Sequence, residues 1–164
     1  MTYAVWCRGA MLGHSDLAEG GPAPNVRVGH LDTTAEFDHL WPEIAPVVDE
    51  VLAAAVAMGS VMADVPPAPE GADPLEYGRE VHERVKDHPG SVRVRAANEA
   101  ITALAFELRD EAGNRVAADF VMVQEVKLPD DIPREAFMRH LEEARRDGHD
   151  VRFPHYLVTA RVSS

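Results

Sequence analysis

The sequence predicts an α+β fold, in which an antiparallel or mixed sheet built from two hairpins and a C-terminal strand packs against several helices. Three observations support this fold. Alternating β-rich segments flank turn residues near the N-terminus and again around residue 110, and helical periodicity fills most of the chain between them. Residues 153–162 alternate as a further strand. We expect a single globular domain over residues 1–164, with a Pro-rich connector at 64–73.

The first hairpin is predicted at the N-terminus. Residues 2–7 are β-rich, Arg8 and Gly9 can form a tight turn, and residues 10–13 can return as the partner strand. A Gly/Pro-rich loop comes next, and a further strand is expected at 26–31.

Two helices are predicted after this strand. Thr33 and Glu36 have the spacing of a capping box, which begins a short helix at 33–41. Pro42 is expected to separate this helix from a longer one near 43–62, because proline removes a helical hydrogen bond. Within the longer helix, apolar side chains recur at the spacing of a core-facing stripe: Ile44, Val48, Val51, Ala55, Met58 and Met62.

The region after the connector carries a strong helix start at Asp73, where an N-cap residue precedes proline, and this helix should run to about Lys86. Residues 91–109 are ambiguous, because they alternate like a strand at first and also keep helical spacing of apolar residues. We choose helix to about Thr102 and strand after it.

The clearest hairpin lies within residues 104–126. Apolar side chains alternate from Leu104 to Leu108, the run Asp-Glu-Ala-Gly-Asn turns the chain, and residues 120–123 return. An amphipathic helix is predicted over 134–148, before the last strand.

The charge and the cysteine content restrict the classes of function. A formal net charge of −12, from 28 acidic and 16 basic residues, argues against direct binding to nucleic acid or to anionic membranes. It favours a protein partner with a basic or mixed surface. Cys7 is the one cysteine, so no internal disulfide can form, and this usage fits the cytoplasm. The first residues also lack the pattern of a signal peptide.

Residues 51–63 form the longest apolar run of the chain. A hydrocarbon core needs about 20 residues to cross, so we interpret this shorter, Ala-rich run as a buried helix. Neither the dinucleotide-binding glycine motif nor the P-loop motif occurs, and nucleotide binding by those routes is unsupported.

The pattern His-x-Asp occurs twice near the N-terminus, and its side chains are candidate metal ligands: His14 with Asp16, and His30 with Asp32. Residues two apart on a strand face the same side, so four donors could meet if the two segments are neighbours. Imidazole and carboxylate suit zinc or a manganese-like ion. Because two occurrences of this pattern barely exceed the number expected by chance from the composition, we do not assign a metal or another cofactor.

Cys7 is the other candidate for chemistry, as a nucleophile with His14 or His30 as its base. A thiol on a buried strand, away from positive charge, stays protonated and inert. The adjacent His14, Ser15 and Asp16 do not form a local triad, because neighbours on an extended chain point to opposite sides.

We therefore expect a small acidic protein that binds another protein without catalysis, in a regulatory or immunity-like role that rests on analogy of charge. An acidic helix face and the loops around 14–32 and 64–73 are the expected contacts. Two alternatives stay open. One is a small metal- or thiol-dependent enzyme built on the N-terminal candidates, and the other is a carrier of an apolar ligand walled by the sheet and by Met58 and Met62. The sequence does not indicate an oligomeric state.

Overall fold

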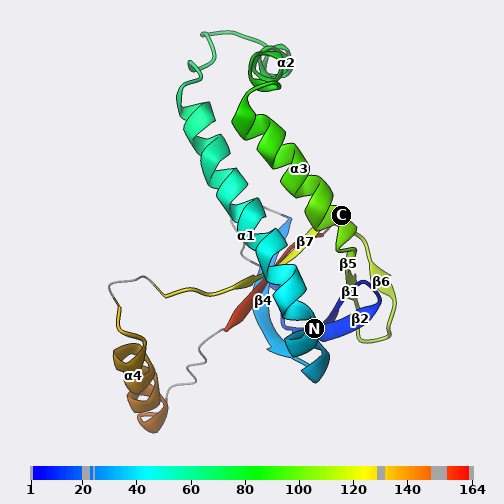
Figure 1. Cartoon of the computed structure of the whole chain (residues 1–164), viewed down its shortest axis with the longest axis vertical. Coiled ribbons are helices and arrows are strands. Elements are labelled where there is room, and N and C mark those ends of the chain that lie inside the picture. The colour runs from blue at the N-terminus through cyan, green and yellow to red at the C-terminus, as the bar shows by residue number, and fades with distance from the viewer. Residues whose placement is uncertain (1, 20–22, 24, 129–131, 149–154, 163–164) are drawn as a thin grey trace. The chain divides into compact units, whose positions relative to one another are not determined.

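The computed structural model describes residues 2–19, 23, 25–128, 132–148 and 155–162. Within these residues the chain has the predicted α+β fold, with antiparallel strands and four helices (Figure 1). The strands are β1 Tyr3–Cys7, β2 Ala10–Ser15, β3 Ala18–Glu19, β4 Val26–Thr33, β5 Phe106–Arg109, β6 Arg115–Val116, β7 Ala118–Glu125 and β8 Tyr156–Val162. The helices are α1 Ala35–Ala63, α2 Pro74–Val85, α3 Pro89–Ala103 and α4 Arg134–Arg146.

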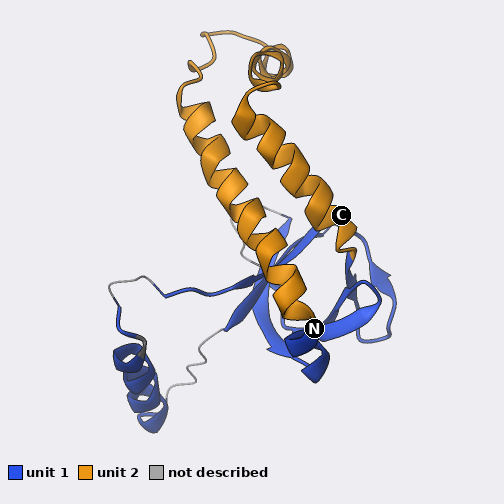
Figure 2. Cartoon of the chain, viewed as in Figure 1, with its two compact units in different colours: residues 1–39, 106–164 blue, residues 40–105 orange. Residues whose placement is uncertain are grey.

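The chain divides into two compact units (Figure 2). Residues 1–39 and 106–164 form the first, which we call the strand unit, and residues 40–105 form the second, which we call the helical unit. The predicted connector lies inside the helical unit, between α1 and α2. A single domain over the whole chain stays a prediction.

The sheet of the strand unit has the order β6-β5-β1-β2-β4-β8-β7, with β3 paired to β4. Every described pairing is antiparallel. The two ends of this order, β6 and β7, are separated along the chain by Ala117 alone, so the sheet curves back on itself. Its fully buried side chains are mostly aliphatic and include Leu12, Leu108 and Val123.

The predicted N-terminal hairpin is confirmed. Arg8 and Gly9 have φ angles of 49° and 81°, and two positive values in a two-residue loop match the right-handed twist of the strands. The return strand β2 runs on to Ser15, beyond the predicted end at 13. His14 and Ser15 are therefore strand residues.

The predicted capping box at Thr33 is wrong, because Thr33 is the last residue of β4 and pairs with Gly13. Thr34 takes the position before the helix. Its amide donates to the carbonyl of Leu12 at 2.9 Å, and its hydroxyl donates to the carbonyl of Met11 at 2.8 Å. Pairing between distant strands thus decides where α1 begins.

The predicted break at Pro42 is also wrong, since α1 is continuous over Ala35–Ala63. Pro42 and Pro46 are both exposed, so the carbonyls that lose their amide partners lie on the solvent side of the helix. Ile44 and Val48 are each 2% exposed. Burial of these side chains in the same turns offsets the missing hydrogen bonds.

The core-facing stripe predicted for this helix is correct only in its first part. Ile44 and Val48 are buried, whereas Ala55 and Met62 are exposed and Ala54 is buried instead. The interpretation of residues 51–63 as a buried helix is wrong, because Ala54 is the one buried residue of that run.

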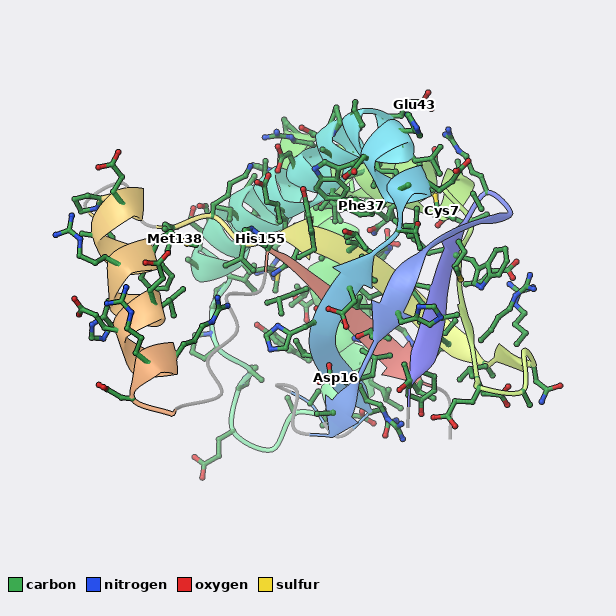
Figure 3. The ribbon with its side chains drawn as sticks, turned by 90° about the horizontal axis from the view of Figure 1, so that it is seen from below. Cys7, Asp16, Phe37, Glu43, Met138 and His155 are labelled. Carbon is green, nitrogen blue, oxygen red and sulfur yellow. The ribbon has the colours of Figure 1, made fainter. Side chains whose placement is uncertain are left out.

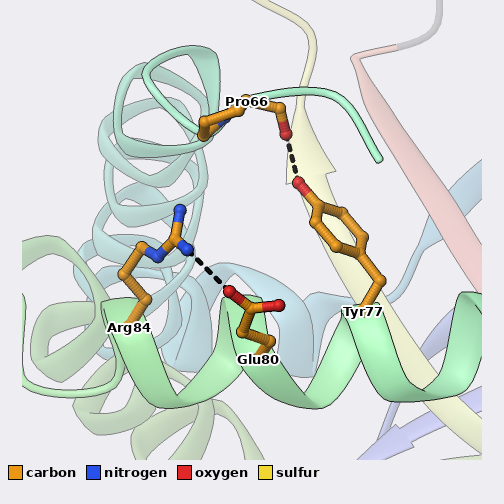
Figure 4. A network of polar contacts seen from close by, with 4 residues as sticks. All are labelled: Pro66, Tyr77, Glu80 and Arg84. Atoms are coloured by element: carbon orange, nitrogen blue, oxygen red, sulfur yellow. Dashed lines mark hydrogen bonds and ion pairs between the residues drawn. The ribbon is translucent and has the colours of Figure 1, made fainter. Parts of the chain in front are cut away.

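The start of α2 is confirmed at Asp73, whose carboxylate accepts from the amide of Leu75 at 2.7 Å. The helix is tied to the connector, because the Tyr77 hydroxyl donates to the carbonyl of Pro66 (Figure 4). Figure 4 also shows the ion pair of Arg84 with Glu80 on the same helix, at 2.8 Å.

Helix was the correct choice for the ambiguous segment, and α3 runs from Pro89 to Ala103. The His88 Nδ1 atom caps it by accepting from the Gly90 amide at 3.1 Å. A Cβ on Gly90 would lie 2.9 Å from the Val61 side chain, so this glycine allows α1 and α3 to approach closely.

The turn of the second predicted hairpin is confirmed, but the strand that pairs with β5 is not the predicted one. The Asp-Glu-Ala-Gly-Asn run joins β5 to β6, which covers only Arg115–Val116. The predicted return segment 120–123 belongs to β7, and β7 pairs with β8. The predicted helix and the last strand are confirmed as α4 and β8, although residues 153–154 of that strand lie outside the described part of the chain.

Candidate functional site

The two His-x-Asp segments lie on neighbouring strands. His14 of β2 stands opposite Asp32 of β4 in the antiparallel register. Two residues further along, the His30 amide donates to Asp16 Oδ1 at 3.1 Å. All four residues are exposed. The structure therefore brings together the segments whose meeting the sequence left open.

This arrangement consists of cross-strand pairs and not of a convergent cluster. The described residues contain no group of three or more His, Cys, Asp or Glu side chains placed to hold a metal ion. The Asp16 carboxylate is engaged with the backbone of β4, where its Oδ1 would lie 2.9 Å from a Cβ on Gly29. His14, Asp16, His30 and Asp32 stay candidates, and no metal is assigned to them.

Cys7 does not meet the candidate bases. It alternates with Tyr3 and Val5 on the buried face of β1, and its side chain is 1% exposed. His14 is an exposed residue that stands opposite Ala4, which belongs to the other face of β1. Figure 3 shows Cys7 and Asp16 well apart. Burial raises the pKa of the Cys7 thiol, and the positive charge of Arg8 offsets only part of this shift.

Ser15 is buried while His14 is exposed, which agrees with the expectation that neighbours on a strand point to opposite sides. The Ser15 hydroxyl oxygen has no hydrogen-bond partner among the described residues. It would lie 2.7 Å from a Cβ on Gly29. A side chain at position 29 would collide with the Ser15 hydroxyl, and glycine avoids this collision.

A shallow cavity of about 370 Å³ lies on the outer face of β1, and sequence reasoning missed it. In the wall of this cavity the Arg109 guanidinium stacks over the Trp6 ring, 4.3 Å from the ring centroid. His14 is another residue that lines the cavity. Its acidic groups already have partners: Glu111 accepts from the amide of Thr2 and Asp110 accepts from the turn that follows β5. The Thr2 contact joins the start of β1 to the turn that follows β5.

The helical unit carries an exposed apolar surface on α1, which we call the outer face: Leu52, Ala53, Ala55, Val56, Gly59, Met62 and Ala63. Val56 is 74% exposed, and Leu52 and Met62 are 39% and 42% exposed. No charged residue occurs between Val51 and Ala63. A helix that is apolar on all sides is normally covered on all sides.

The same helix is the one candidate for a membrane span among the described residues, by length and composition alone. Glu50, one turn before the outer face, forms a two-pronged ion pair with Arg93 at 2.6 and 2.8 Å. The bonds from Arg93 lower the pKa of Glu50. This pair is about half exposed and suits a water-facing helix surface.

A cavity of about 570 Å³ that is open to solvent lies on the helical unit, between α1, α2 and α3, and half of its lining residues are exposed. Met58, Val85 and Val94 line it from the three helices. Met62 is not among its walls, and neither is the sheet, so these walls differ from those that the sequence suggested for an apolar-ligand carrier. The volume lies within the range of about 300–1,000 Å³ that is usual for small-molecule sites.

Comparisons with protein-family models, with curated proteins and with solved structures found no match. The functional argument therefore starts from the geometry of these sites.

Proposed function

We propose that this chain is a non-enzymatic protein-binding module, and that the outer face of α1 is its contact surface. The observation that carries the proposal is an uncharged stretch of thirteen residues, Val51–Ala63, in which Ala54 alone is buried. Patches of contiguous apolar surface on soluble proteins mark interaction sites. The acidic face and the loops that we expected from the sequence stay predictions beside this surface.

The charges around the outer face favour a partner with a basic border. Asp49 precedes the uncharged stretch and Asp64 follows it, and α1 contains neither Lys nor Arg. A second copy of this chain would bring its own acidic residues to the same border, where like charges repel. An amphipathic helix that places Lys or Arg beside its apolar stripe matches both features.

The dimensions of the outer face also suit a helix. Thirteen residues of α-helix extend about 20 Å, which is close to the length of an ordinary partner helix. Gly59 has nothing within 4 Å of its Cβ position, so a partner backbone can approach α1 there. The large exposed side chains Leu52 and Val56 stand one turn apart and provide the anchors.

The test uses two synthetic helical peptides with the same Leu/Ala stripe, one flanked by Lys and one flanked by Glu, titrated by fluorescence anisotropy. We expect the Lys-flanked peptide to bind, with an affinity that falls as salt is added. Val56→Glu should weaken it about tenfold or more, because a charge then enters the apolar contact.

Leu75→Glu is the matched control, since Leu75 is also 74% exposed but lies on α2. Both variants add one negative charge, so attraction by charge alone would strengthen both complexes. Equal affinity of the two variants for the Lys-flanked peptide would contradict the proposal. A wild-type dimer in sedimentation equilibrium that Val56→Glu dissociates would show instead that a second copy covers this face.

A further inference from the structure

We propose that the cavity of the helical unit is a binding site for a small apolar anion, such as a medium-chain carboxylate. This site is separate from the outer face of α1. Met58, which lines the cavity, lies on the side of the helix that faces α3, where the Ser91 hydroxyl contacts its sulfur at 3.6 Å. The inference does not depend on the protein-binding proposal.

The body of the cavity suits an apolar chain. Its lining exposes mainly carbon, from Met58, Val85, Val94 and the aliphatic stem of Lys86. Methionine adapts to the outline of an apolar ligand because its side chain is unbranched and polarizable. A volume of about 570 Å³ leaves room for a ligand larger than a few ordered waters.

Two polar side chains of the wall are held by the protein itself. The Thr102 hydroxyl donates to the carbonyl of Asn98 at 2.7 Å, and the Ser91 hydroxyl is directed to the Met58 sulfur. These groups are thereby engaged within the fold. These two hydroxyls therefore need no hydrogen bond from a ligand, and an apolar chain can lie against them.

The charges of the cavity select the anion. Lys86 and Arg95 are cationic and Glu99 is anionic, but the charge of Lys86 is already matched by Glu83 and Asp87, so Arg95 is the cation that a ligand can meet. Lys86 is paired with Glu83 at 2.6 Å. The Arg95 guanidinium makes one long hydrogen bond, at 3.3 Å, to the Lys86 carbonyl. Its other N–H donors can take a carboxylate in the two-pronged geometry that arginine favours.

The experiment titrates the full chain with decanoate, decanol and decyltrimethylammonium below their micelle concentrations, by calorimetry. These probes share one alkyl chain and differ in the charge of the head. We expect decanoate to bind about tenfold tighter than decanol, and the cationic probe to bind weakest. Equal binding of decanoate and decanol would overturn the assignment of an anion.

Arg95→Gln should reduce the affinity for decanoate about tenfold and leave decanol unchanged, because only the anion uses the guanidinium. Arg79→Gln is the matched control, since Arg79 is exposed on α2 and does not line the cavity. Glu99→Gln should tighten decanoate binding by removing a repulsive charge. If Arg95→Gln and Arg79→Gln bind decanoate alike, the proposed site is wrong.

Discussion

Alternation along the strands decides which of the N-terminal residues can act together. Cys7 and Ser15 are on the buried face of the sheet. The side chains of His14, His30, Asp16 and Asp32 are exposed. A thiol and an imidazole on opposite faces of one hairpin cannot share a proton directly. The residue types of a reactive site are therefore present in the sequence, but the strand geometry separates them.

The Cys7 thiol provides a prediction at this scale. Because burial raises its pKa and closes it to solvent, we expect native protein to react slowly with iodoacetamide at neutral pH. Denatured protein is the control and should react at the rate of a free thiol, followed by mass spectrometry. Fast alkylation of the native chain would show that Cys7 is accessible and ionised.

Gly29 provides a second prediction. A methyl group there would lie 2.7 Å from both the Leu17 amide nitrogen and the Ser15 hydroxyl oxygen. Gly29→Ala should therefore lower the free energy of unfolding by about 1–3 kcal/mol, as overpacking commonly does. Urea denaturation measures this change, and an unaltered midpoint would show that β2 and β4 do not approach as closely as described.

Local signals identified the helices and turns that depend on local chemistry. The Asp73 cap, the end of α2 near Lys86 and the Asp-Glu-Ala-Gly-Asn turn all lie where the sequence places them. The start of α1 could not be predicted in this way. It depends on hydrogen bonds from Thr34 to residues of β2 more than twenty positions away.

An exposed helical glycine gives a prediction of opposite sign. Gly78 lies in α2 and has nothing within 4 Å of its Cβ position. Gly78→Ala should raise the free energy of unfolding by about 0.5–1 kcal/mol, because alanine loses less backbone entropy in a helix. The urea midpoint should rise, and a fall would indicate that α2 is not helical at this position.

The turn after β5 gives a prediction on acid stability. The Asn114 side-chain amide donates to Asp110 Oδ2 at 3.1 Å, and this bond is the main reason that the pKa of Asp110 is lowered. The backbone amides of Asn114 and Ala112, which donate to Oδ1 at 2.8 and 3.0 Å, lower it further. A lowered folded-state pKa stabilises the fold above the unfolded value of about 3.9, and this contribution is lost as the pH falls through the folded-state value.

Asp110→Asn should therefore be less stable than the wild type at pH 7, and the difference should shrink as the pH falls below about 3.9. Urea midpoints of both proteins at a series of pH values test this expectation. A difference that is the same at every pH would mean that the charge of Asp110 does not contribute.

At the scale of the whole molecule, the sequence predicted the α+β class and missed the candidate binding surfaces. The run Val51–Ala63 is apolar on every side, and such a run is compatible with a helix that is fully buried or only half covered. Only the tertiary arrangement shows that Val56 is exposed and Ala54 is not. The cavity of the helical unit likewise depends on three helices that meet from distant segments.

The acidic charge of the chain acts on both proposals. It favours the basic border of the proposed protein partner, and it leaves Arg95 as the cation on which the proposed anion site depends. The two sites lie on one unit and use different sides of α1. A substitution of Val56 should therefore affect binding of the protein partner alone, and a substitution of Arg95 should affect binding of the anion alone.

The most direct test of the central claim, that function resides on the outer face of α1 and not at the N-terminal His and Asp residues, is NMR mapping with the Lys-flanked peptide. Amide signals of the ¹⁵N-labelled chain would be followed during the titration. We expect the shifts to concentrate within Leu52–Ala63, with His14 and His30 unchanged. Shifts centred on His14 and His30, with Leu52–Ala63 unchanged, would contradict the account.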